Sequence, residues 1–229
     1  MRLNLGSGAN LFEGWLNVDI DDVEETYLRH LRSAQNVDGW PEWQRRQWEF
    51  LRGGGVFKFQ RYDFTKKWRQ YATNRSDRLG PFYDVEAIYL GQVVEHLNPL
   101  YELPALLKQC HKVLKPGGVL RLTTPCFDKI LTAWMNDRMG DFAPEQPPFY
   151  ALASNTQQLS YLLFGATGPN STRSNYEGHM HIWTPSTLEP VVREAGFTGE
   201  IDFSWPSKRL PDVRDFGESH SFALEVCKT

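Results

Sequence analysis

The sequence predicts an α/β fold built on a parallel sheet with helices on both faces. Three observations support it. Short apolar runs typical of buried strands alternate with segments of helical periodicity. Glycines follow the first apolar run directly, and Lys115-Pro116-Gly117-Gly118 forms a strong turn signal before the fifth run. Strand–helix–strand alternation of this kind is typical of parallel sheets.

The expected strands are short runs of apolar and β-branched residues that end in polar or glycine-rich punctuation. Each is three to seven residues long, within the usual range for strands. In chain order we expect strands at Leu3–Leu5, Trp15–Ile20, Val56–Tyr62, Val85–Leu90, Val119–Thr123, Thr198–Phe203 and Ser221–Cys227.

Helical spacing of apolar side chains predicts a helix over Leu103–Val113 between the fourth and fifth strands. Near the C-terminus two helix starts compete: Thr184-Pro185, with proline in the first position, and Ser186-x-x-Glu189, a capping box. Pro190 favours the later start, because it then falls within the first turns. Gly196 ends that helix.

A chain of 229 residues fits a single domain, which we assign to 1–229. Two stretches depart from the alternation, and we interpret them as insertions at about 21–55 and 126–180, since neither is long enough for its own core. Both are rich in aromatic residues. We expect them to form the acceptor side of the cleft and to become ordered when ligand binds. The alternative is that their rings fill a small satellite core. Their expected helices are 23–33, 42–52, 128–135 and 155–164.

Composition excludes several classes of protein. The formal net charge is −3 and the pI about 6.1, so we expect no nucleic-acid partner. The longest apolar run is Phe149–Ala153, and a spanning helix needs about 20 apolar residues, so we expect no membrane partner. Three cysteines without C-x-x-C spacing, and no secretory signal at the start, favour a cytoplasmic protein without disulfides.

Polar residues at the ends of the first three strands carry the main functional signal. Gly6-Ser7-Gly8 lets backbone approach a nucleotide closely, although Leu11 stands where a dinucleotide fingerprint needs its third glycine. Asp19 ends the second strand, where a carboxylate can accept hydrogen bonds from ribose hydroxyls. Asp63 repeats the pattern after the third strand, with Phe64 beside it as an adenine wall.

Together these segments resemble the class I S-adenosylmethionine-dependent methyltransferases, and most closely their small type-11-like subgroup. The resemblance is carried by L-N-L-G-S-G, W-L-N-V-D-I, Y-D-F, A-I-Y-L-G-Q-V-V-E-H-L and L-K-P-G-G-V-L-R-L-T-T-P. The segment H-I-W-T-P-S-T-L-E-P-V-V-R-E-A-G-F resembles the family's helix before its last two strands. About 1–20, 56–125 and 180–229 are covered.

The resemblance implies a Rossmann-like, seven-stranded, mostly parallel sheet with an antiparallel last strand. It also implies S-adenosylmethionine as cofactor and methyl transfer to an O or N of a small-molecule or sugar-type acceptor. The first helix is reduced here to about a turn, since six residues separate Gly8 from Trp15. By position, the residues implied to hold the cofactor are Gly6, Ser7, Gly8, Asp19, Asp63, Phe64, Gly91 and Gln92.

Histidines are the candidate catalytic groups. His96 follows the fourth strand and, by the resemblance, lies near the cleft as a general base or packs the next helix. In His179-x-His181 the spacing suits a metal, but no acidic or cysteine partner stands at ligand spacing, so we expect no metal. Instead His181 is expected to line the acceptor pocket with Tyr176.

Two other functions stay open at this point. One is a non-catalytic module that binds adenosylmethionine or a nucleotide. The other is a nicotinamide-dependent oxidoreductase, which is disfavoured by Leu11 at the third-glycine position and by Asp63 after the third strand. Gln146-Pro147-Pro148-Phe149 is similar to a signature of enzymes that methylate amino groups of nucleic acids. That signature belongs at the end of the fourth strand. Here it lies beyond the fifth, so we interpret it as a loop turn.

Overall fold

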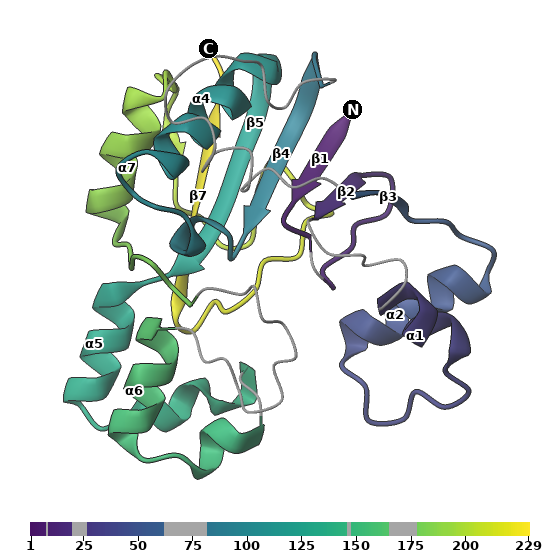
Figure 1. Cartoon of the computed structure of the whole chain (residues 1–229), viewed down its shortest axis with the longest axis vertical. Coiled ribbons are helices and arrows are strands. Elements are labelled where there is room, and N and C mark those ends of the chain that lie inside the picture. The colour runs from purple at the N-terminus through teal and green to yellow at the C-terminus, as the bar shows by residue number, and fades with distance from the viewer. Residues whose placement is uncertain (8, 20–26, 62–81, 146–147, 165–177) are drawn as a thin grey trace.

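The computed structural model describes residues 1–7, 9–19, 27–61, 82–145, 148–164 and 178–229. A seven-stranded sheet forms its centre, with strand order β3-β2-β1-β4-β5-β7-β6 (Figure 1). The strands are β1 (Arg2–Leu5), β2 (Leu16–Asp19), β3 (Lys58–Arg61), β4 (Val85–Gly91), β5 (Leu114–Pro125), β6 (Ile201–Asp202) and β7 (Ser221–Cys227).

Parallel pairing joins β3, β2, β1, β4 and β5, and β7 runs antiparallel to both β5 and β6. The predicted sheet is therefore confirmed, its antiparallel last strand included. Strand β5 begins earlier than expected, at Leu114. The predicted turn at 115–118 therefore lies inside the strand, where it makes the pairing with β4 irregular. Gly117 has φ +75°, and the β4–β5 register shifts between Val85 and Ala87.

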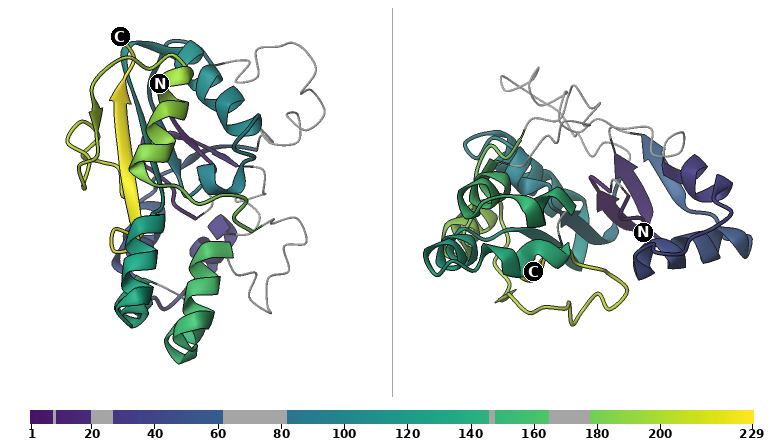
Figure 2. Two further views of the ribbon diagram at one scale, coloured as in Figure 1. Left: turned by 90° about the vertical axis from the view of Figure 1, so that its left-hand side faces the viewer. Right: turned by 90° about the horizontal axis from the view of Figure 1, so that it is seen from below.

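The two faces of the sheet are covered differently. On one face, α4 (Glu102–Val113) and α7 (Pro185–Glu194) bury their apolar sides against the strands. On the other, Tyr89 packs with the loop residues Phe12 and Trp15 and with Leu210 of the chain after β6. The described part of this second face is thus covered by irregular chain, seen opposite the helices in the left view of Figure 2.

Helix α7 begins at the earlier of its two possible starts, so the preference for the later start was wrong. Thr184 is the N-cap, and Pro185 occupies the first turn. The reason is a reciprocal pair of bonds: the Thr187 amide donates to the Thr184 hydroxyl (3.2 Å), and the Thr184 amide donates to the Thr187 hydroxyl (3.0 Å). Pro190 lies inside the helix.

Both insertions lie beyond the carboxyl ends of the parallel strands, on either side of the centre (Figure 1). The first contributes α1 (Arg29–Ser33) and α2 (Glu42–Arg52), and Leu31 is buried in their satellite core. The second contributes α5 (Phe127–Met135), α6 (Asn155–Phe164) and the short helices η3 (Met139–Glu145) and η4 (Pro148–Leu152) around the buried Tyr150. Among the described residues, some of the aromatic side chains of the two insertions therefore fill satellite cores.

None of the described helices combines the length and the apolar character that crossing a bilayer requires.

Candidate active site

The turn after β1 is tied to the end of β2. Gly6 has φ +69°, a conformation that glycine adopts without strain. The amides of Gly6 and Ser7 both donate to the carbonyl oxygen of Val18, at 2.8 and 3.1 Å. The Ser7 hydroxyl is buried and has no hydrogen-bond partner among the described residues. A buried hydroxyl of this kind is costly unless something else satisfies it, which is what a polar ligand at this turn does.

Two buried asparagines hold the rest of this loop, and the sequence analysis missed them. Asn4 Nδ2 donates to the Asn10 carbonyl (2.6 Å) and to Asn17 Oδ1 (2.9 Å), which also accepts from the Phe12 amide (2.9 Å). These bonds fix the loop where the described residues between β1 and β2 form no helix. The available signal was an asparagine flanked by apolar residues in each of two buried strands.

Asp19 ends β2 and is 8% exposed. Parallel pairing of Leu5 with Val18 brings Asp19 to the same edge as Gly6 and Ser7, as the sequence predicted. Gly8, Asp63 and Phe64 lie outside the described residues, and so does Tyr176.

The end of β4 has two unusual residues. At Gly91 a Cβ atom would lie 2.5 Å from the Tyr89 ring, so only glycine fits there. Gln92 has φ +56°, an uncommon conformation for a residue with a side chain. Its amide donates to the Thr123 carbonyl (2.9 Å), and its Nε2 reaches the Thr123 and Ser221 hydroxyls, each at 3.4 Å. The chain is thus held against β5 and β7 where β4 ends.

A second group of polar residues follows β4. Glu95 is fully buried, and burial raises the pKa of its carboxyl to about 8. The His96 and His179 rings meet edge to face, with centroids 5.0 Å apart. Burial, and then the neighbouring His96, lower the pKa of His179 to about 4, so that its imidazole is neutral near pH 7.

The His181 side chain does not belong to this group. Its side chain is exposed, and its ring contacts Trp183 at 4.3 Å between centroids. The structure therefore brings His96 together with His179 and Glu95, and leaves His181 toward solvent. The sequence shows no acidic residue at ligand spacing from His179 and His181, and for that reason no metal was expected. In the structure Glu95 supplies such an acidic group.

Comparison with known proteins decides the family. Residues 36–200, more than half of the chain, match a family model described as a methyltransferase domain. The chain belongs to the S-adenosylmethionine-dependent methyltransferases. None of the curated proteins matches its sequence significantly. The strand order and the antiparallel last strand are those expected of class I members.

One solved structure supports the same fold. An O-methyltransferase family protein from Burkholderia thailandensis aligns with TM-score 0.50 and 12% identity, over 100% of this chain and 50% of that one. A SAM-dependent methyltransferase from Archaeoglobus fulgidus has TM-score 0.45 and 13% identity, over 99% and 85% of the two chains. Human N-acetylserotonin methyltransferase has 0.47 and 17%, over 99% and 47%. The chain thus spans about half of two of these three proteins.

The residues at the strand ends of this methyltransferase fit S-adenosylmethionine. The unpartnered Ser7 hydroxyl and the positive φ of Gly6 offer a polar contact and a close backbone approach. Beside them Asp19 supplies a carboxylate suited to a ribose diol.

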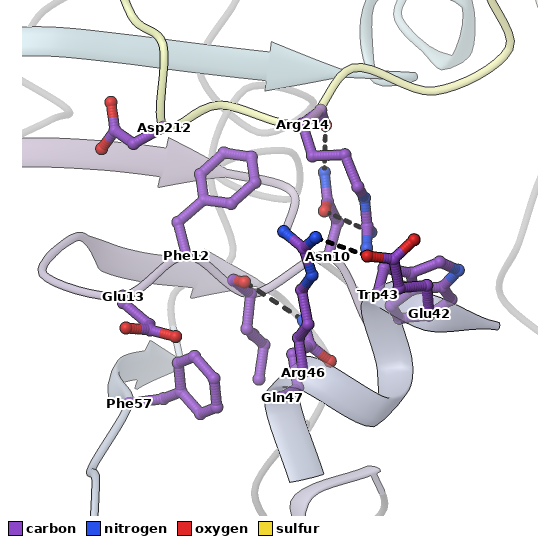
Figure 3. Close-up of a pocket in the computed structure, with 11 residues that line it drawn as sticks. Asn10, Phe12, Glu13, Glu42, Trp43, Arg46, Gln47, Phe57, Asp212 and Arg214 are labelled. Atoms are coloured by element: carbon purple, nitrogen blue, oxygen red, sulfur yellow. Dashed lines mark hydrogen bonds and ion pairs between the residues drawn. The ribbon is translucent and has the colours of Figure 1, made fainter. Parts of the chain in front are cut away.

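A cavity of about 500 Å³ lies between the loop around Asn10, helix α2 and the segment at Arg214 (Figure 3). The Arg214 guanidinium lies 4.2 Å from the centroid of the Trp43 ring and 4.1 Å from that of Phe216, and it donates to Asn10 Oδ1 (2.7 Å). Burial lowers the pKa of Arg214 to about 10. The cavity shares no lining residue with the described cofactor residues, so we do not assign the cofactor to it.

Proposed function

We propose that this methyltransferase transfers the methyl group of S-adenosylmethionine to an oxygen or nitrogen of a small-molecule or sugar-type acceptor. The observation that carries the proposal is the polar set of Gly6, Ser7, Asp19 and Gln92 at the carboxyl edge of the sheet. Open α/β sheets bind their ligands at this edge. A helical group stands on each side of it (Figure 1).

The cofactor supplies an electrophilic methyl group on a sulfonium, and the chain's own residues bind and orient. Gly6 and Ser7 would face its methionine and ribose portions, and Asp19 the ribose hydroxyls. Gly91 and Gln92 would lie beneath the sulfonium and the acceptor. The sequence adds Gly8, Asp63 and Phe64 to the proposed cofactor contacts.

A general base is needed where the acceptor is weakly acidic, and His96 and His181 are the candidates. His181 is exposed, and its ring contacts that of Trp183. His96 is the last residue of η2 (Val94–His96), which follows β4. Replacing each histidine by glutamine and measuring turnover against pH tests which one holds the proton.

The whole chain is proposed to act as one methyltransferase domain, 1–229, whose insertions form the acceptor side of the cleft. Trp43 and Trp48 on α2 provide a matched pair, because Trp48 packs in the satellite core and Trp43 lines the cavity. We expect Trp48→Ala to lower mainly the melting temperature and Trp43→Ala to lower turnover. If both variants lose only stability, the insertions are structural.

The decisive experiment combines binding and turnover. Mass spectrometry of small molecules that co-purify with the chain, and calorimetry with S-adenosylhomocysteine, report the cofactor. A panel of hydroxyl- and amine-bearing small molecules and sugars, assayed for methyl transfer, reports the acceptor. Micromolar cofactor binding with transfer to a panel member supports the proposal. Tight binding without transfer to any acceptor class would instead support a binding module.

A further inference from the structure

Glu95, His96 and His179 bring three groups that ligate metals to one point beyond the end of β4. One carboxylate oxygen and one nitrogen from each ring lie within 4.8 Å of one another. The three residues come from two distant parts of the sequence. They are held together because the amides of Met180 and His181 donate to the Glu95 carbonyl, at 2.7 and 3.2 Å.

The carboxylate is oriented by a neighbour and only half satisfied. The Thr124 hydroxyl donates to Glu95 Oε2 at 3.1 Å. The other oxygen, Oε1, is buried and has no hydrogen-bond partner among the described residues. Glu95 is 0% exposed, so bulk solvent does not reach this oxygen. A buried carboxylate oxygen left in this way calls for a cation or a proton donor.

His179 is also oriented for coordination. Its Nδ1 lies 3.0 Å from the carbonyl oxygen of Leu162. Because a carbonyl only accepts, Nδ1 carries the proton and Nε2 presents its lone pair. Metal-binding histidines are typically oriented in this way, by donating their other ring N–H to a carbonyl or carboxylate.

We propose that this cluster binds a divalent cation of the zinc type through Glu95 Oε1, a ring nitrogen of His96 and Nε2 of His179. Two histidines and one carboxylate form a ligand set that Zn²⁺ accepts, with metal–ligand distances of about 2.0–2.2 Å. Tetrahedral ligands then stand about 3.4 Å apart, and one donor atom of each residue already lies within 4.8 Å of the others. Three protein ligands leave a fourth position open.

Cation binding goes beyond the proposed function, and the open coordination position concerns the acceptor. Cation binding stands on the cluster alone. The open position, which rests on the proposed function, is suited to an acceptor that carries a hydroxyl oxygen. Coordination uses the lone pair of His96, so the role of general base then falls to His181.

The test uses the untagged full-length chain, stripped with chelator and then titrated with Zn²⁺ by calorimetry and with Co²⁺ by visible absorption. We expect micromolar or tighter affinity, and a Co²⁺ spectrum of four- or five-coordinate type. His96→Gln and His179→Gln should each weaken binding at least about tenfold, and Glu95→Gln should do the same. His30→Gln, at an exposed histidine outside the cluster, is the matched control and should leave the affinity unchanged.

Zn²⁺ affinity weaker than about 100 µM, or affinity unchanged in His96→Gln and His179→Gln, would overturn the proposal. His181→Gln separates it from the alternative pair His179-x-His181: equal losses in His181→Gln and His179→Gln, with none in His96→Gln, would assign the ion to that pair. If Glu95→Gln fails to fold by circular dichroism, Thr124→Val, which removes the hydroxyl that orients Glu95, takes its place. Calorimetry with S-adenosylhomocysteine is run separately, so that failure of cofactor binding and failure of metal binding are distinguished.

Discussion

Replacing Asp19 by alanine removes the carboxylate at the end of β2 and should weaken cofactor binding selectively. The side chain is 8% exposed, so the proposed contacts with ribose hydroxyls would form largely out of water. Charge-assisted hydrogen bonds of this kind contribute about 1.5–3 kcal/mol, which corresponds to a loss of roughly 10–150-fold in affinity. Calorimetry with S-adenosylhomocysteine measures this loss directly.

Asp38→Ala is the matched control, because Asp38 is an exposed aspartate on the first insertion. Melting temperatures of both variants report whether the fold is intact. If Asp19→Ala binds within about twofold of the wild-type protein while remaining folded, the strand-end set does not hold the ribose. Binding of NADH in place of the adenosylmethionine product would refute the assignment of the cofactor.

Four further variants and one binding assay test other parts of the structure. Gly91→Ala forces a methyl group against the buried Tyr89 ring and should lower stability by about 1–3 kcal/mol and weaken cofactor binding, measured by thermal melting and calorimetry; an unchanged melting temperature would contradict the close contact. Arg121→Met removes the cation that pairs with the buried Asp215 side chain and one of the two cations that pair with Glu225, and should cost about 3–5 kcal/mol in urea unfolding. A loss below about 1 kcal/mol would mean that Asp215 finds another partner. Thr184→Ala should cost about 1 kcal/mol through loss of the α7 cap, and a larger loss in Ser186→Ala would place the cap at Ser186 instead. The chain should bind duplex DNA negligibly at about 150 mM salt, and nanomolar binding in a gel shift would contradict the argument from net charge.

The sequence by itself determined the order and type of the elements that form the sheet. Apolar runs bounded by turns predict buried strands because burial on both faces demands continuous apolar side chains. For the same reason the ends of those runs located Gly6 and Asp19 at one edge, since parallel strands point their carboxyl ends the same way. Helix α2 was found at its observed limits, because it carries its own apolar face and a glycine stop.

Competing local signals were harder to rank. Both Thr184 and Ser186 are residue types that cap helix N-termini, so either could begin α7. The structure selects Thr184 because its hydroxyl and that of Thr187 satisfy each other's amides. The proline that favoured the later start is tolerated inside the helix. Such a choice depends on bond geometry that residue types do not specify.

Only the tertiary structure decided which polar residues meet. Glu95 and His179 stand far apart in the sequence, and they meet where the amides of Met180 and His181 donate to the Glu95 carbonyl. Arg121 lies in an apolar strand, and its partners Asp215 and Glu225 come from the C-terminal part of the chain. Periodicity reports whether a residue is buried, because burial follows from position on one element. It does not report the partner, because the partner is set by the packing of elements that have no local relation to it.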